Sequence, residues 1–292
     1  MTLLSLLRAD GVHISCEIFP PKAFTQMEDV KTVAKDIAAL SPAYISVTYG
    51  AAGNTPHFTR ETSETVQALG IPALSHLTCI NDTKSKISAV LDDLERAGIQ
   101  NVLALRGDIP DGHPFPDADH FRHASELIAA IKQRGGFCIG AACYPEGHPE
   151  SPSRDKDLDY LKQKMDAGTD FLTTQMFFDN NILYNFLYRA LQKGITLPVC
   201  AGIMPVVNAK QIKRITALSG AGLPPRFAAI IDRFGGDPAS MREAGIAYAT
   251  EQVIDLIANG VNCIHLYTMN KPDIAATLFG NLRAILGNQA HE

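Results

Sequence analysis

The sequence has no run of lysine and arginine, no long apolar segment and no paired cysteine motif. Its 292 residues carry a formal net charge of -5, and this balance argues against nucleic acid or an anionic membrane as the main partner. No stretch approaches the roughly 18 apolar residues of a membrane span, and the amino-terminal residues lack the basic region and long apolar core of a signal peptide. We therefore expect a cytoplasmic protein that binds small molecules.

Several common site motifs are also missing. No GxGxxG follows a candidate strand and no GxSxG occurs, so neither a Rossmann dinucleotide site nor a hydrolase nucleophile is indicated. The six cysteines stand one or two at a time in apolar runs, which is typical of buried free thiols in a reducing compartment. We expect no metal site, because histidines and carboxylates do not gather at the predicted strand ends as ligand sets do.

Strand-like and helix-like segments alternate along the chain. Short apolar or β-branched runs are followed by amphipathic segments that end on glycine; one such helix is predicted to begin after Thr83 and to end before Gly98. The eight candidate strands cover residues 13–19, 44–50, 73–79, 101–107, 138–144, 171–177, 198–204 and 263–269. Such strands pair in parallel through right-handed crossovers.

Eight strand-helix units predict an α/β protein with a (β/α)8 TIM barrel, formed by residues 1–292 as a single catalytic domain. The long interval between Met204 and Cys263 predicts two or three extra helices between strands seven and eight, one of them over residues 224–236. An open, doubly wound sheet is the alternative architecture.

Polar side chains recur at the predicted carboxyl ends of the strands, where barrel enzymes place their working residues. Glu17 is the least expected of them, because an ionised carboxylate in an apolar interior costs several kcal/mol unless it is paired, solvated or neutralised. Alternation along the strand places it with His13 and Ser15, so we expect it to point into the barrel mouth. A buried ion pair with Arg106 would be a purely structural explanation, but the convergence of many polar groups on one rim favours an active site.

Seven motifs at these strand ends are specific in combination: CEIFPPK, SVTYGA, HLTC, LALRGD, AACYPEGHPE, TTQMFFD and GIMPVVNAKQ. In this order they resemble the methylenetetrahydrofolate reductases of the bacterial single-domain type, over residues 11–286 or nearly the whole chain. The resemblance implies an FAD-dependent enzyme that reduces 5,10-methylenetetrahydrofolate to 5-methyltetrahydrofolate, which supplies methyl groups for methionine synthesis. It also implies ping-pong hydride transfer from NAD(P)H, with NADH expected, and a homo-oligomeric assembly.

The resemblance makes Glu17 and Asp108 the catalytic residues. Opening the ring that holds the bridging methylene requires protonation of N10, and partial burial favours a carboxyl that keeps its proton. Asp108 would lie between pterin and flavin, where its charge stabilises the 5-iminium cation. The implied FAD contacts are Thr48, Tyr49, Ala51, His76, Arg106, Gly107, Asp108, Ala124, Tyr144, His148, Asp157 and Lys164. The implied substrate contacts are Thr48, Gln175, Gln211 and Lys271.

The chain departs from the family pattern at four positions. Tyr160 and Gln163 stand on the helix expected to bind the diphosphate, which removes one cation. Lys271 replaces an expected arginine and loses its bidentate fork, and Ile215 stands where an aromatic ring could stack on the aminobenzoyl group. Two other functions stay open at this point: a pterin-dependent one-carbon transferase without redox chemistry, and a non-catalytic flavin- or folate-binding protein.

Overall fold

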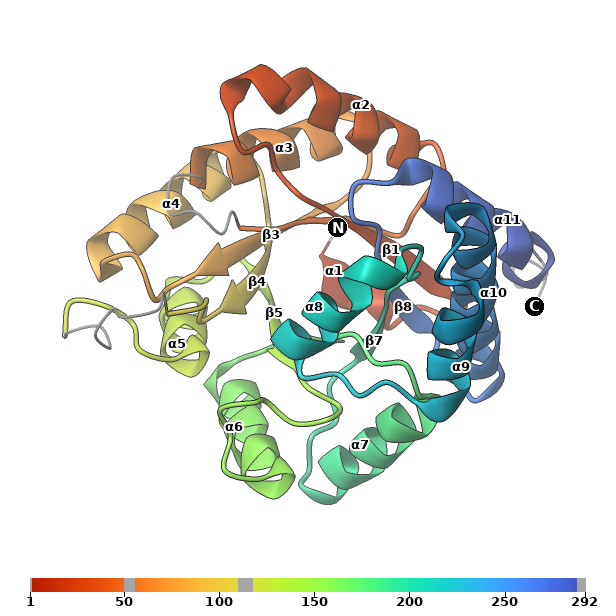
Figure 1. The fold of residues 1–292 in the computed structure, drawn as a ribbon. Helices are drawn as coiled ribbons and strands as arrows, with labels where there is room; N and C mark the ends of the chain where they lie inside the picture. Colours follow the sequence, from red (N-terminus) through yellow and green to blue (C-terminus); the bar gives the residue numbers. More distant parts are fainter. Residues whose placement is uncertain (1, 50–55, 110–117, 288–292) are drawn as a thin grey trace.

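A closed parallel barrel is the centre of the structure (Figure 1). The computed structural model describes residues 2–49, 56–109 and 118–287, and within these residues eight strands pair in chain order. The strands are β1 (His13–Ile18), β2 (Ile45–Val47), β3 (Ala73–Thr78), β4 (Asn101–Leu105), β5 (Cys138–Cys143), β6 (Phe171–Thr174), β7 (Val199–Ile203) and β8 (Cys263–Tyr267). The predicted (β/α)8 barrel is therefore confirmed.

Helices surround the barrel, and the last of them, α11, packs beside α2 to close the ring (Figure 1). The helices that follow β1 to β6 are α2 (Met27–Ala38), α3 (Pro56–Ala68), α4 (Lys84–Arg96), α5 (Ala124–Arg134), α6 (Arg154–Ala167) and α7 (Asn180–Gln192). α11 (Pro272–Gly287) follows β8, the last strand. The short α1 (Leu3–Leu7) precedes β1, and a 3-10 turn, η1 (Phe24–Gln26), leads into α2. In the described residues, no helix combines the length and apolar character that spanning a bilayer requires.

Three helices fill the long interval between β7 and β8, as predicted: α8 (Ala209–Ser219), α9 (Pro225–Phe234) and α10 (Pro238–Ala258). The predicted ends of α4 are also confirmed. The hydroxyl of Thr83 accepts a hydrogen bond from the Lys86 amide at 3.3 Å, and Gly98 adopts a left-handed φ of 72° just after the helix.

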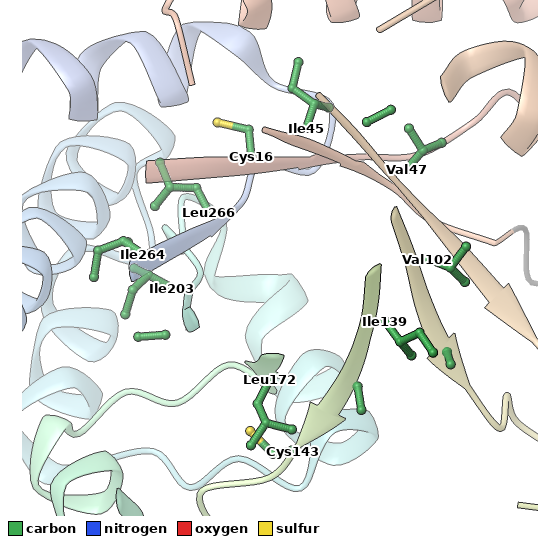
Figure 2. Packing of buried hydrophobic residues seen from close by; sticks show 14 of the residues in the cluster. Cys16, Ile45, Val47, Val102, Ile139, Cys143, Leu172, Ile203, Ile264 and Leu266 are labelled. Carbon is green, nitrogen blue, oxygen red and sulfur yellow. The ribbon is translucent and has the colours of Figure 1, made fainter. Parts of the chain in front are cut away.

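The main apolar core lies between the strands and the helices. Along β1, Ile14, Cys16 and Ile18 belong to this core, whereas Ser15 and Glu17 point the other way, as the period of two requires. Figure 2 shows the same outward placement around the barrel for Cys16, Ile45, Val47, Val102, Ile139, Cys143, Leu172, Ile203, Ile264 and Leu266. Because burial outside the strands supplies the core, the inward face is free to carry polar groups.

The barrel interior is apolar at its amino-terminal end. Leu3 and Leu7 of α1 pack there against inward side chains that include Leu74, Leu103 and Phe171. This apolar plug leaves the carboxyl end of the strands as the place for polar groups of the interior.

All six cysteines are buried and free, as predicted.

Each strand is shorter than its predicted segment, and the reason is clear for β6. The apolar run at 171–177 predicts a strand to Phe177, but β6 ends at Thr174. Phe177 is still fully buried in the main core, and Phe178 packs with Phe227 in a separate cluster under the extra helices. The apolar run continues because it meets helices, not because the strand continues.

Gly245 of α10 is expected to tolerate no side chain. A β-carbon at this position would lie 1.8 Å from the carbonyl oxygen of Val206, which belongs to the backbone and cannot rotate away. We predict that Gly245→Ala lowers the free energy of unfolding by roughly 3 kcal/mol, measured by urea denaturation. Gly280→Ala is the matched control, because a β-carbon there meets nothing within 4 Å, and alanine should stabilise α11 by roughly 0.5 to 1 kcal/mol. Equal stability of the two variants would contradict this packing.

Candidate active site

A cavity of about 600 Å³ opens at the carboxyl ends of the strands, between the loops that follow β2 to β5 and helix α6. This volume falls in the usual range for small-molecule sites. Nine of the predicted FAD contacts line it: Tyr49, Arg106, Gly107, Asp108, Ala124, Tyr144, His148, Asp157 and Lys164. Thr48 and His76 do not line it, and Ala51 lies outside the described residues. Tyr160 and Gln163, the two departures on α6, line it as well.

Lys164 is a half-buried cation in the wall of this cavity. Its Nζ donates a hydrogen bond to the carbonyl oxygen of Ala142 at 2.9 Å, and burial lowers the pKa of the ammonium group. The first turn of α5 reaches the same cavity through Ala124 and Ser125, and unpaired amides at a helix start attract negative charge. The wall therefore suits an anionic group such as a phosphate.

Arg106 is paired with Glu150 rather than with Glu17. The guanidinium group donates two parallel hydrogen bonds to the Glu150 carboxylate, at 2.5 and 2.7 Å, and this pairing lowers the pKa of Glu150. The ion pair between Glu17 and Arg106 considered from the sequence is therefore wrong. Arg106 follows the end of β4 and turns toward the loop after β5, whereas Glu17 stays on β1.

The backbone passes close to its neighbours at Gly107. This residue has a left-handed φ of 87°, and a β-carbon would lie 3.0 Å from the β-carbon of Thr78, so glycine is required here. The phenol side chains of Tyr49 and Tyr144 also line the cavity. Tyr49 donates a hydrogen bond to Asp82 at 2.9 Å, and burial raises the pKa of Tyr144 to about 12. Both rings therefore present neutral hydroxyl groups near the cavity.

Glu17 is buried, with 8% of its surface exposed, and it sits between two imidazole rings. Its Oε2 lies 3.6 Å from Nε2 of His76 and 3.7 Å from Nε2 of His265, both too long for hydrogen bonds. Burial lowers the pKa of His76 to about 4, so this ring is neutral at neutral pH and forms no ion pair with Glu17. In the part of the chain that the structure describes, Nε2 of His76 has no hydrogen-bond partner.

The sequence reasoning missed His265. This inward residue of β8 is 1% exposed, and its Nδ1 and Nε2 lie 2.7 and 3.3 Å from the hydroxyls of Ser15 and Ser46. The signal was available, because the alternation that orients Glu17 on β1 also makes His265 and Tyr267 inward on β8. Tyr267 pairs in register with Glu17. Burial raises the pKa of the Tyr267 phenol, and the nearby Glu17 carboxylate adds to this effect.

Gln211 and Lys271 come together at a second, small cavity of about 10 Å³, which Ile215 and Tyr267 also line. Gln175 lines neither cavity; its Oε1 accepts a hydrogen bond from the Met176 amide at 2.9 Å. The predicted substrate contacts thus fall at different places on the rim. Among the described residues, no group of three histidine, cysteine, aspartate or glutamate side chains is arranged to hold a metal.

Comparison with known sequences identifies close relatives. A family model described as methylenetetrahydrofolate reductase matches residues 2–283. The 5,10-methylenetetrahydrofolate reductase of Pectobacterium carotovorum subsp. carotovorum is 33% identical, over 93% of this chain and 90% of that protein. Methylenetetrahydrofolate reductase (NADH) 1 of Zea mays is 35% identical, over 93% of this chain and 48% of the plant protein. The chain therefore spans most of the bacterial relative and about half of the plant one.

Solved structures share the barrel at lower identity. An uncharacterized protein from Clostridium thermocellum, described as binding two copies of 5-methyl-5,6,7,8-tetrahydrofolic acid, has a TM-score of 0.64 at 15% identity and covers 98% of this chain. At that identity the likeness concerns the fold alone. The family model and the bacterial relative each cover nearly the whole sequence, and the chain accordingly belongs to the methylenetetrahydrofolate reductase family.

Proposed function

We propose that this protein is an FAD-dependent reductase that uses NADH to convert 5,10-methylenetetrahydrofolate into 5-methyltetrahydrofolate, the methyl donor for methionine synthesis. The observation that carries the proposal is the position of Glu17, a buried carboxyl at the carboxyl end of β1 beside the neutral ring of His76. Family membership supports the reaction, and the plant relative named for NADH supports the choice of reductant. We also propose a homo-oligomeric assembly, which the family resemblance implies, and a cytoplasmic location, which the sequence pattern indicates.

The residues around the larger cavity fit FAD. Lys164 and the start of α5 suit its diphosphate, and the cavity volume of about 600 Å³ suits a cofactor of this class. When bound, FAD supplies a hydride acceptor toward NADH and a hydride donor toward the folate. We propose that the nicotinamide and the folate use the same region in turn, in a ping-pong reaction.

Glu17 supplies the proton in this proposal. Protonation of N10 breaks the bond from N10 to the bridging carbon, and the N5 lone pair forms the 5-iminium cation that accepts hydride. An imidazolium ion at 3.6 Å would stabilise the ionised form of Glu17, so a neutral His76 suits a proton donor. Asp108 lines the larger cavity with an exposed carboxylate, and its charge would stabilise the cation.

Lys271 and Gln211 are proposed to bind the folate side of the reaction, because both line the second cavity beside Tyr267. The ammonium group of Lys271 suits a folate carboxylate, although as a point charge rather than a fork. Thr48 and Gln175 complete the proposed substrate contacts on the family resemblance alone.

The first test is an absorbance spectrum of the purified protein. We expect a yellow protein whose flavin absorbance bleaches on addition of NADH and returns on addition of 5,10-methylenetetrahydrofolate. Bleaching by NADH separates a reductase from a one-carbon transferase, which would consume no NADH. A colourless protein that gains no activity with added FAD would defeat the proposal.

The second test removes the proton of Glu17. Glu17→Gln should slow folate reduction roughly 10²- to 10⁴-fold, because general acid catalysis contributes about that factor, while NADH still bleaches the flavin. The matched control is Glu243→Gln on the exposed side of α10, which should leave both half-reactions unchanged. If Glu17→Gln reduced the folate normally, Glu17 would not be the acid, and a non-catalytic binding role would regain support.

The depressed pKa of His76 predicts a pH effect on stability. Between pH 6.5 and 4, the His76 side chain is protonated in the unfolded chain but stays neutral in the folded protein. The free energy of unfolding should therefore fall as the pH is lowered through this range. His76→Gln removes this contribution. Its free energy of unfolding should therefore drop less than that of the parent protein between neutral pH and pH 5, by roughly 1 to 2 kcal/mol in urea titrations. Equal pH dependence would show that His76 is not held neutral.

A further inference from the structure

The turn after β8, residues 268–271, is conformationally strained. Met269 and Asn270 have left-handed φ angles of 54° and 55°, which residues other than glycine adopt only at an energetic cost. A hydrogen bond of 3.0 Å from the Lys271 amide to the Thr268 carbonyl closes the turn. Strain that persists in a folded protein points to contacts that hold it in place.

Asn270 makes two such contacts with Phe19. Its Oδ1 accepts a hydrogen bond from the Phe19 amide at 2.7 Å, and its Nδ2 donates one to the Phe19 carbonyl at 3.1 Å. Phe19 is the first residue beyond β1, and Pro20 and Pro21 follow it without amide protons. The last register pair of β1 and β8 is Glu17 with Tyr267, so the Asn270 amide group replaces the next peptide group of β8.

The same turn holds the backbone of Glu17. The buried hydroxyl of Thr268, 3% exposed, donates a hydrogen bond to the Glu17 carbonyl at 2.5 Å. On the other side of β1, the Thr48 amide bonds the Ile18 carbonyl at 3.1 Å. The backbone is therefore fixed at Glu17, at Ile18 and, through Asn270, at both polar groups of Phe19.

We propose that Asn270 is a positioning residue that holds the carboxyl of Glu17 in place for proton transfer, acting through the backbone of Phe19. The inference rests on the proposed function, because it assigns Asn270 to the folate half-reaction. Proton transfer needs heavy atoms within hydrogen-bond reach, and a displacement near 1 Å can cost about 10²-fold in rate. The NADH half-reaction needs no proton from Glu17, so it should not depend on Asn270.

The test compares Asn270→Gly and Asn270→Ala in the flavin-loaded protein. Both substitutions remove the side-chain amide group of Asn270. Glycine adopts a φ of 55° without strain, whereas alanine is strained at this angle. We expect the folate half-reaction to slow roughly 10- to 100-fold in both variants, with flavin bleaching by NADH unchanged. Asn270→Ala should also unfold at a lower temperature than Asn270→Gly. If the two variants reduce the folate at equal rates but differ in stability, the loss of rate comes from the missing hydrogen bonds and not from backbone strain.

Hydrogen exchange supplies a readout that does not depend on activity. The Phe19 amide should exchange faster in both variants, and the two prolines that follow it simplify its assignment in a peptide covering residues 13–22. Asn259→Gly is the matched control. Asn259 also donates a side-chain hydrogen bond to a carbonyl, that of Asp255 at 2.8 Å, but it lies before β8. This control should change neither half-reaction nor exchange at Phe19.

Three results would overturn the inference: an unchanged folate half-reaction in Asn270→Gly, unchanged exchange at Phe19, or a parallel loss of both half-reactions. The last result would mean that the hydrogen bonds from Asn270 to Phe19 serve folding alone. Failure of the proposed function is distinguishable, because the parent protein would then show no reaction with NADH or folate in the first place.

Discussion

Closure of a parallel barrel forces every second side chain of each strand into a shared interior, and the placement of Glu17 depends on this constraint. Its outward neighbours Cys16 and Ile18 are anchored in the apolar core around the strands, so the strand cannot rotate to expose the carboxyl without losing that burial. The architecture therefore buries Glu17, which is 8% exposed. It also buries the neighbouring ring of His76, which is neutral and so gives Glu17 no charged partner. The carboxyl therefore stays inside the barrel, beside the neutral ring of His76.

The interior divides along the barrel axis, and the division explains how it can be both stable and polar. At the amino-terminal end Leu3, Leu7 and Phe171 form an apolar plug. One layer higher, the hydroxyls of Ser15 and Ser46 lie within hydrogen-bond distance of His265, so this buried ring has partners. The polar groups at the carboxyl end therefore lie above a layer of hydrogen-bonded side chains.

Local patterns in the sequence predicted the strand order, the helix positions and the direction of Glu17, because each depends on near neighbours in the chain. Contacts between distant loops could not be predicted in that way. The partner of Arg106 is Glu150, which follows a different strand, and the bonds from Asn270 to Phe19 join opposite ends of the chain. His265 is an intermediate case, since alternation made it inward but only the barrel register placed it beside Ser15 and Glu17.

The two cations of the larger cavity differ in what they can offer to an anionic ligand. The fork of Arg106 is already matched to the two oxygens of Glu150, so an anion at Arg106 has to compete with a bidentate carboxylate. The ammonium group of Lys164 has three N–H donors. Within the described residues it donates a hydrogen bond to the Ala142 carbonyl, which is a neutral group. Its burial also leaves the charge poorly solvated, which strengthens attraction to an anion. If FAD binds as we propose, Lys164 would therefore be the better anchor for its diphosphate, whereas Arg106 holds the loop that carries Glu150.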